Sequence, residues 1–302
     1  MNTPLPALPD FIARAMPFDR RMLALEDAPN AGLLLHCIDH GARTARPVLM
    51  LHGNPTWSFL WRKVIARLDG FRCLAPDLLG LGLSSKLRRL SEHTVRRHGE
   101  AIAELIRRMA LEDIVLVVQD WGGPIGLAAA ARVPERIAGV VIANTAVILP
   151  KQPRGTAFHR FARMPVVSDL VFRLFGFPLR QLHRAQGDPG SIRGDVARAY
   201  RWPLRHLHDR VAPLAMARMV PDGPDHPSLG EMRRGQAWIE AFPGPVALVW
   251  GHRDPVLGRA LKRHAQALEG ALLTDTPAGH FLQEEVPDEL AAAVRTVAER
   301  SA

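Results

Sequence analysis

The sequence predicts an α/β fold in which a mostly parallel, twisted sheet has helices on both faces and carries an inserted helical segment. Short apolar runs rich in Val, Ile and Leu alternate with helical stretches along most of the chain. Continuous apolar strands separated by helices are typical of a parallel sheet that is buried on both faces. The alternation stops only between about residues 151 and 236, where helical pieces broken by Pro and Gly replace it.

The strands are predicted where short apolar runs end at Gly, Pro, Asp or Asn, because these residues mark turns. In chain order the runs are 32–39, 47–53, 72–77, 114–120, 138–145, 245–251 and 271–277. Longer stretches between them indicate helices at 57–68, 94–110 and 124–137.

The break in this pattern predicts two domains. Residues 1–150 and 237–302 are expected to form the core domain, and residues 151–236 a helical cap, or lid, inserted between two strands. Such an insertion would cover the carboxyl ends of the strands, where open α/β sheets bind their ligands.

Composition excludes several classes of protein. Hydrophobic residues make up 47% of the 302 residues, which is ample for a large core, and no apolar run has the length of a membrane span. The first 21 residues contain prolines and charges where a signal peptide needs an apolar segment, so a cytoplasmic location is predicted. The two cysteines, Cys37 and Cys73, lie in strand-like runs and are expected to be buried free thiols.

The formal net charge of +9 is interpreted as a compositional bias toward Arg, because only four of the 39 basic residues are Lys and no nucleic-acid motif accompanies them. Nucleic acid is therefore not expected as a partner. Neither a cofactor nor a metal is expected either. The excess is uneven, since residues 151–236 hold 14 Arg and one Lys against six Asp and one Glu. An acidic partner or surface at the cap is the alternative interpretation.

Asp120 is the candidate nucleophile. It closes the run 114–120, and Gly122 and Gly123 follow it before a helix rich in small residues. This strand–turn–helix pattern is that of the nucleophile elbow of α/β-hydrolases, where the turn lifts the side chain above the sheet. The alternative is an Asp that caps the helix. The flanking glycines and the partners below favour the nucleophile.

The loop after the run 47–53 supplies the candidate anion-binding groups. It reads His-Gly-Asn-Pro, and in α/β-hydrolases this loop and the residue after the nucleophile each provide a backbone N–H to the oxyanion hole. Asn54 and Trp121 are then the donors. Their side chains also carry N–H groups.

Asp254 and His280 complete a candidate triad. Asp254 follows the run 245–251, whereas the nearby His252 is interpreted as a loop residue. His280 follows the run 271–277 and precedes a helix with acidic residues. A His in this place can serve as a general base oriented by a carboxylate. The chain order of Asp120, Asp254 and His280 matches nucleophile, acid and base of the α/β-hydrolase fold.

At these residues the sequence resembles the haloalkane dehalogenases. The matching stretches are HGNPTWSFLWR, VVQDWGGPIGL, WGHRDPVLG and AGHFLQEE, and the resemblance covers the sheet domain nearly end to end but the cap more loosely. It implies that Asp120 displaces halide from carbon, that His280 activates water against the resulting ester, and that Asp254 is the acid. It also implies that Asn54 and Trp121 hold the halide, the Asn–Trp version of the family.

Some family members differ at two positions. Some place the acid after the strand read here as 138–145, but Asn144 and Thr145 carry no carboxylate, which favours Asp254. Others use a cap Trp as second halide donor, so Trp202 stays an alternative to Asn54. Trp57 and Trp202 are the candidates for the substrate pocket, with a hydrophobic haloalkane as substrate. The cap also resembles that of a subfamily that includes β-lactone decarboxylases, and this is the alternative function.

Three further readings fit less well. Epoxide hydrolases activate the epoxide with two cap tyrosines, and this chain has one Tyr, Tyr200. Fluoroacetate dehalogenases carry an Arg near the nucleophile that the stretch QDWGGP lacks. A binding protein on the hydrolase fold would usually have lost the nucleophile or the base, and both candidates are present here.

Overall fold

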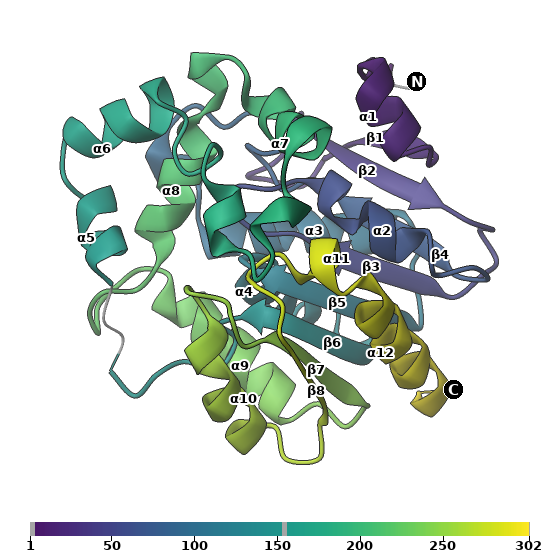
Figure 1. Cartoon of the computed structure of the whole chain (residues 1–302). Coiled ribbons are helices and arrows are strands. Elements are labelled where there is room, and N and C mark those ends of the chain that lie inside the picture. The colour runs from purple at the N-terminus through teal and green to yellow at the C-terminus, as the bar shows by residue number, and fades with distance from the viewer. Residues whose placement is uncertain (1–3, 153–155, 302) are drawn as a thin grey trace.

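The computed structural model describes residues 4–152 and 156–301, so that residues 1–3 and 302 of the predicted core and residues 153–155 of the predicted cap lie outside it. Its centre is an eight-stranded sheet in the order β1-β2-β4-β3-β5-β6-β7-β8 (Figure 1). The strands are β1 (Arg20–Ala24), β2 (Leu34–His40), β3 (Pro47–Leu51), β4 (Arg72–Pro76), β5 (Ile114–Asp120), β6 (Ile137–Thr145), β7 (Val246–Gly251) and β8 (Leu272–Thr276).

The sheet is parallel from β4 to β8 and antiparallel at one edge, where β2 pairs with both β1 and β4. Each of the seven predicted runs forms a strand. The first strand, β1, was missed by the sequence analysis, because the stretch Arg-Arg-Met-Leu-Ala lacks the β-branched residues that indicate a strand.

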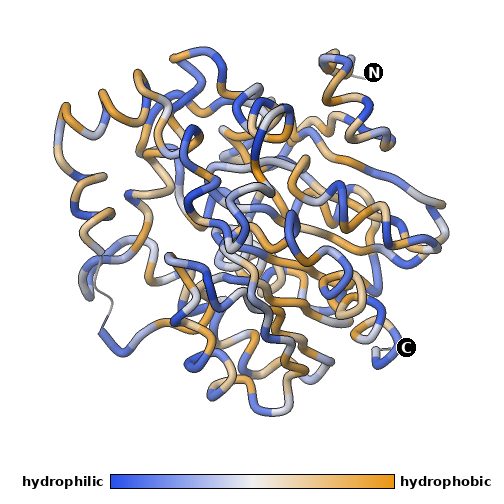
Figure 2. The backbone as a smooth tube through the Cα atoms, in the orientation of Figure 1, coloured by the Kyte–Doolittle hydropathy of each residue, from blue (hydrophilic) through white to orange (hydrophobic). Residues whose placement is uncertain are grey.

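Helices cover both faces of the sheet, and the alternation of side chains along β5 shows how. Ile114, Leu116 and Val118 pack in one hydrophobic cluster with α3 (Val95–Arg108), α4 (Gly122–Ala130) and α9 (Leu229–Glu240). Val115 and Val117 point the other way, into a cluster with α1 (Asp10–Ala15), α2 (Arg62–Ile65) and α12 (Pro287–Arg300). Figure 2 shows the resulting hydrophobic strands at the centre of the molecule.

Two predicted helices are shorter than expected. The stretch 57–68 contains a 3-10 turn at Ser58–Trp61 followed by the single turn α2. In the stretch 124–137, α4 ends at Ala130 and a separate 3-10 turn begins at Pro134, a residue that cannot continue a helix hydrogen-bond ladder. The predicted helix 94–110 is present as α3.

The interval between β6 and β7 holds helices and no strand in its described residues. The α-helices are α5 (Ala157–Ala162), α6 (Val167–Asp169) with a π-helical turn over Leu170–Leu174, α7 (Gly194–Arg201), α8 (Val211–Met219) and α9, and short 3-10 turns lie among them. α9 begins inside the predicted cap range and packs on α4, where a Cβ at Gly235 would lie 2.9 Å from Leu127 Cβ. The division into core and cap stays a prediction.

After β7, α10 (Leu261–Ala267) connects to β8, the last strand of the sheet. α11 (Leu282–Glu285) and α12 follow β8. No helix in the described part of the chain is long and apolar enough to cross a membrane. Both cysteines are buried and free, and burial raises the pKa of the Cys73 thiol to about 12.

Candidate active site

Asp120 lies at the carboxyl end of β5, in a turn so tight that the second and third residues after it, Gly122 and Gly123, have no room for a side chain. Its φ of +49° is in the left-handed region, which Asp tolerates better than most residues. A Cβ at Gly122 would lie 2.1 Å from the carbonyl oxygen of Leu51, and one at Gly123 would lie 2.0 Å from Thr145 Oγ1. The two glycines therefore let α4 begin directly against the ends of β3 and β6, and the Asp120 carboxylate stands above the sheet.

The loop after β3 approaches this carboxylate through its backbone. The His52 ring fixes the start of the loop, since its Nε2 accepts the Leu78 N–H at 2.9 Å. A Cβ at Gly53 would lie 2.2 Å from Asp120 Oδ1, so a glycine is needed here. The Asn54 N–H donates to Asp120 Oδ1 at 2.7 Å. One carboxylate oxygen of Asp120 is thus held, and the other is free of hydrogen bonds in the described part of the structure.

The two candidate side-chain donors differ in what they contact. The Trp121 side chain is 7% exposed, and its indole N–H has no hydrogen-bond partner among residues 4–152 and 156–301. Asn54 Nδ2 donates to the carbonyl of Pro213 on α8 at 3.0 Å, which uses one of its two N–H bonds. The Trp121 indole and the Asn54 amide therefore each have an N–H group that can donate a hydrogen bond to an anion.

His280 lies between two carboxylates. Its Nδ1 is 2.8 Å from Asp254 Oδ2, and its Nε2 is 3.6 Å from Asp120 Oδ2, too far for a direct hydrogen bond. Burial lowers the pKa of His280, but the charge of Asp254, together with Asp120, raises it to about 10. Burial alone would raise the pKa of Asp254, but His280 and the backbone N–H groups of Val256 and Leu257 lower it below its ordinary value. The imidazolium is therefore stabilised in the resting site.

Asn144 supports Asp254 from the end of β6, a role that the sequence analysis missed. Its Nδ2 donates to Asp254 Oδ2 at 2.8 Å, and its Oδ1 accepts the Gly251 N–H at 2.8 Å. The sequence analysis considered Asn144 only as a residue without a carboxylate. Its place at the carboxyl end of a parallel strand was the signal that it would face the site.

The loop that carries His280 is joined to the inserted segment by a dense set of hydrogen bonds. The His280 N–H donates to the Ala185 carbonyl at 2.7 Å. The Gln186 side chain accepts the Phe281 N–H at 2.9 Å and donates to the Phe281 carbonyl at 3.2 Å. Nothing in the sequence pattern indicated these contacts, because their partners are about 95 residues apart along the chain.

Glu284, a carboxylate four residues after His280, belongs to a separate buried cluster. Arg62 donates to both of its oxygens, at 2.6 and 2.9 Å, and Lys63 lies 3.1 Å away. The hydroxyl of Tyr200 donates to Glu284 Oε1 at 2.5 Å. The one tyrosine of the chain is therefore committed to Glu284 and does not offer its hydroxyl to a ligand at Asp120.

The two candidate pocket tryptophans lie in different surroundings. Trp57 is buried, and its indole N–H donates to the Ala199 carbonyl of α7 at 3.1 Å. Trp202 lines a pocket on the inserted segment whose wall contains none of Asp120, Trp121 and His280. In the described residues, no group of three or more His, Cys, Asp or Glu side chains is arranged to hold a metal ion.

Comparison with known protein families extends over most of the chain. The family described as the α/β hydrolase fold matches residues 46–287. A haloalkane dehalogenase of Mycobacterium marinum is 34% identical over 274 residues, which cover 89% of each chain. Haloalkane dehalogenase 1 of Mycobacterium bovis is 35% identical over 255 residues, or 81% of each chain.

Solved structures agree with this match. The haloalkane dehalogenase DpaA from Paraglaciecola agarilytica NO2 is similar with a TM-score of 0.78 at 26% identity, over 94% of this chain and 93% of the other. The haloalkane dehalogenase DatA from Agrobacterium tumefaciens C58 is similar with a TM-score of 0.81 at 25% identity, over 94% and 97% of the two chains.

Proposed function

The chain belongs to the haloalkane dehalogenase family of α/β hydrolases, and we propose that it hydrolyses a carbon–halogen bond through a covalent alkyl ester on Asp120. The observation that carries this assignment of roles is the position of His280, which hydrogen-bonds Asp254 on one side and faces Asp120 across 3.6 Å on the other. The substrate is a hydrophobic haloalkane, and the products are an alcohol and a halide ion.

In the first step, the free oxygen of Asp120 attacks the carbon that carries the halogen. A C–O bond forms, the carbon–halogen bond breaks, and the halide leaves with the bonding electrons. Hydrogen-bond donors stabilise the transition state when they already lie where this negative charge develops. The unpartnered indole N–H of Trp121 and the spare N–H of the Asn54 amide are the proposed halide ligands. The step needs no base, because attack by a carboxylate on carbon removes no proton.

In the second step, water attacks the carbonyl carbon of the ester and His280 Nε2 takes the proton. The hydrogen bond from the Asn54 N–H, seen on Asp120 Oδ1, stabilises the oxyanion that forms there. Asp254 orients the imidazole and stabilises its charged form. The C–O bond to the alkyl group is kept while the aspartyl C–O bond breaks, and the alcohol leaves with a proton.

Formation of the ester changes the protonation of His280. The Asp120 carboxylate is one of the groups that hold the pKa of His280 near 10 in the resting site. Alkylation removes this negative charge, so the pKa of His280 falls in the intermediate and its proton can pass to solvent before the second step. The first step thereby prepares the base that the second step needs.

In this proposal the inserted segment, residues 151–236, is a cap that shields the reaction from bulk water. Trp57 stays a prediction as a wall of the substrate pocket, since its side chain is buried and its N–H is engaged by Ala199. Trp202 stays a prediction as a substrate contact, and the cytoplasmic location also stays a prediction.

The test of the mechanism is a trapped intermediate. In a His280→Phe variant, we expect one halide per chain to be released from a 1-bromoalkane and an alkyl ester to remain on Asp120. Intact-mass spectrometry should show the added alkyl group, and peptide mapping should place it in residues 114–124. His252→Phe is the matched control, because His252 is an exposed histidine of the neighbouring loop and should leave turnover unchanged.

Steady turnover by His280→Phe, or an unmodified protein where the wild type is active, would contradict the covalent mechanism. A long-chain β-lactone serves as the second substrate. If the wild type ignores every haloalkane and releases an alkene from the lactone, the alternative function from the sequence analysis replaces this one.

A further inference from the structure

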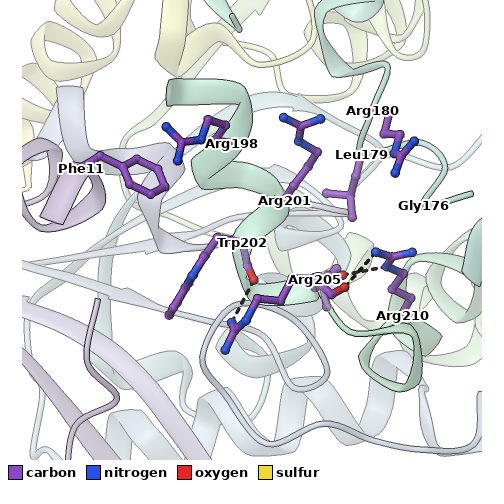
Figure 3. Close-up of a pocket in the computed structure, with 10 residues that line it drawn as sticks. Phe11, Gly176, Leu179, Arg180, Arg198, Arg201, Trp202, Arg205 and Arg210 are labelled. Carbon is purple, nitrogen blue, oxygen red and sulfur yellow. Dashed lines mark hydrogen bonds between the residues drawn. The ribbon is translucent and has the colours of Figure 1, made fainter. Parts of the chain in front are cut away.

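The inserted segment carries a pocket, separate from the proposed active site, whose wall is dominated by arginine. It is an open pocket of about 340 Å³ between α7, the loop 176–180 and α1 (Figure 3). Arginine side chains approach it from several sides, namely Arg180, Arg198, Arg201, Arg205 and Arg210. Like charges around one cavity repel each other, and an anion between them would relieve this repulsion.

Most of these positive charges have no negative partner in the described structure. Arg198 pairs with Asp195 at 2.6 Å, but the other arginines of the pocket form no ion pair with any described residue. Arg201 donates to the Ala197 carbonyl, and Arg205 to the Trp202 carbonyl. These two hydrogen bonds satisfy N–H groups without neutralising either charge.

The guanidinium of Arg210 is held in place by backbone carbonyls, among them that of Leu204 at 2.7 Å. Burial, together with the nearby charge of Arg180, lowers the pKa of Arg210. Arg180 itself makes no hydrogen bond or ion pair among the described residues. Apart from Asp195, which pairs with Arg198, no acidic side chain in the described part of the chain neutralises this cluster, so solvent and dissolved ions must screen it.

Between the arginines, the pocket is lined by apolar side chains. Leu179 and Leu204 are buried beneath it, and the rings of Phe11 and Trp202 flank it. The guanidinium carbon of Arg198 lies 4.4 Å from the ring centre of Phe11. That of Arg205 lies 4.6 Å from the ring centre of Trp202. Stacking on a ring holds an arginine in a defined position and leaves its N–H edge available to a ligand.

An exposed apolar patch adjoins the pocket. It consists of Val166, which is 78% exposed, Phe175, which is 57% exposed, and the half-exposed Leu170, Leu174 and Leu207. Arg210 connects the two features, because it also donates to the carbonyls of Arg173 and Leu174 at the end of the patch. Exposed apolar side chains gathered in this way mark a surface that contacts an apolar ligand, a membrane or a partner.

We propose that the pocket binds the anionic head of an amphiphile, a phosphate or carboxylate group on an alkyl chain, with the chain lying along the apolar patch. The planar, forked guanidinium group matches the oxygens of such a head group. A purely ionic ligand would leave the apolar lining and patch without a role, and an acidic peptide would do the same. The amphiphile comes either from solution or from an anionic bilayer.

Octyl phosphate below its micelle-forming concentration is the probe for the dissolved source. We expect isothermal titration calorimetry to give saturable binding of one molecule per chain, weakened by added salt. Inorganic phosphate, without a chain, and octyl glucoside, without a charge, should bind more weakly. In the double variant Arg180→Ala/Arg201→Ala the affinity should fall at least about tenfold, because two charged hydrogen-bond donors are lost.

The matched control is Arg43→Ala/Arg259→Ala, which removes the same charge from exposed arginines of the core. It should leave the affinity unchanged. Dehalogenation by both double variants should equal that of the wild type, since none of the four residues belongs to the proposed catalytic machinery. Phe175→Ser should weaken octyl phosphate and leave inorganic phosphate unaffected.

Lipid vesicles test whether the amphiphile comes from a bilayer. Co-sedimentation with phosphatidylcholine vesicles that contain phosphatidylglycerol, and not with pure phosphatidylcholine, identifies a bilayer lipid, and the pocket variant should abolish it. Binding of octyl phosphate without vesicle binding identifies a dissolved amphiphile. The proposal is overturned if neither is bound, if the pocket variant binds as the wild type does, or if polyglutamate is bound in place of both.

Discussion

Charged groups are arranged in opposite ways at the carboxyl edge of the sheet and on the surface of the inserted segment. At the sheet edge, His280 lies between Asp254 and Asp120, and each of the two acids also accepts a backbone N–H group. On the inserted segment, Arg180, Arg201, Arg205 and Arg210 have no acid partner among the described residues, which places a net positive field at the pocket.

The difference follows from how the two regions hold their side chains. Strand ends and tight turns fix the sheet-edge groups in the geometry that a reaction requires, so their charges can compensate one another. Arg201, Arg205 and Arg210 lie in or next to short helices and donate to carbonyls, which leaves their charge without an acidic partner. Arg180 lies in the loop 176–180 and has no partner among the described residues. The arrangement at the sheet edge suits catalysis, and the arrangement at the pocket suits binding of a ligand that carries a negative charge.

The largest expected effect comes from a substitution of Asp120, the proposed nucleophile at the sheet edge. Asp120→Asn should lower turnover by about 10⁶-fold, the order of loss seen when a nucleophile is removed. Asn tolerates a positive φ, and its amide oxygen can still accept the Asn54 N–H, so the melting temperature should stay close to that of the wild type. Turnover above about a thousandth of the wild-type value would exclude Asp120 as the nucleophile. Intact mass should confirm that the amide has not been hydrolysed back to Asp.

The next effect tests the pairing of charges. Asp254→Asn should lower the rate of ester hydrolysis by up to about 10⁴-fold, because an Asn cannot stabilise the imidazolium of His280. Hydrolysis needs neutral His280, so its rate rises as pH rises through the pKa of that residue. Loss of the Asp254 charge lowers this pKa, and the pH profile should move to lower pH. The burst of halide from the first step should stay independent of pH in this range.

An unchanged hydrolysis rate in Asp254→Asn would mean that another carboxylate serves as the acid. Glu284→Gln is the control, because Glu284 is bound by Arg62, Lys63 and Tyr200 and does not contact His280 in the structure. Its effect should fall on stability and leave the pH profile in place.

How far the sequence predicts the molecule differs between the same two regions. The strands of the core were predicted because buried parallel strands leave continuous apolar runs, and the turns after them carry Gly and polar residues for reasons of backbone geometry. The polar support of the site was not predicted. Asn144 and Gln186 act through contacts with residues 110 and 95 positions away, and no local pattern encodes such pairs.

The inserted segment was predicted only in outline. Its helices are short and interrupted, so the spacing of apolar residues over one or two turns does not say which face is buried. The excess of arginine was visible in the composition. That five of these arginines surround one pocket depends on tertiary packing.

An intermediate effect tests the halide ligands. Trp121→Phe keeps an aromatic ring and removes the N–H, and it should slow carbon–halogen cleavage by about 10²–10³-fold. Bromide should also quench the tryptophan fluorescence of the wild type more strongly than that of the variant. Trp202→Phe is the matched control, and halide binding that depends on Trp202 and not on Trp121 would move the donor to the inserted segment.

The smallest expected effect concerns Gln186, where the two regions meet. Its side chain accepts the Phe281 N–H and donates to the Phe281 carbonyl, next to His280. Gln186→Ala should let the His280 loop shift and slow ester hydrolysis by about tenfold, within the range of up to about 10² known for small misplacements of catalytic groups. The burst of halide should stay unchanged, because the first step does not use His280. Gln186→Glu keeps the acceptor for the Phe281 N–H and should recover part of the rate, whereas Gln181→Ala, an exposed glutamine of the same segment, should have no effect. If Gln186→Ala slowed both steps equally, the contact would act on the shape of the whole site. If it slowed neither, the inserted segment would not position His280, and the two regions would be independent.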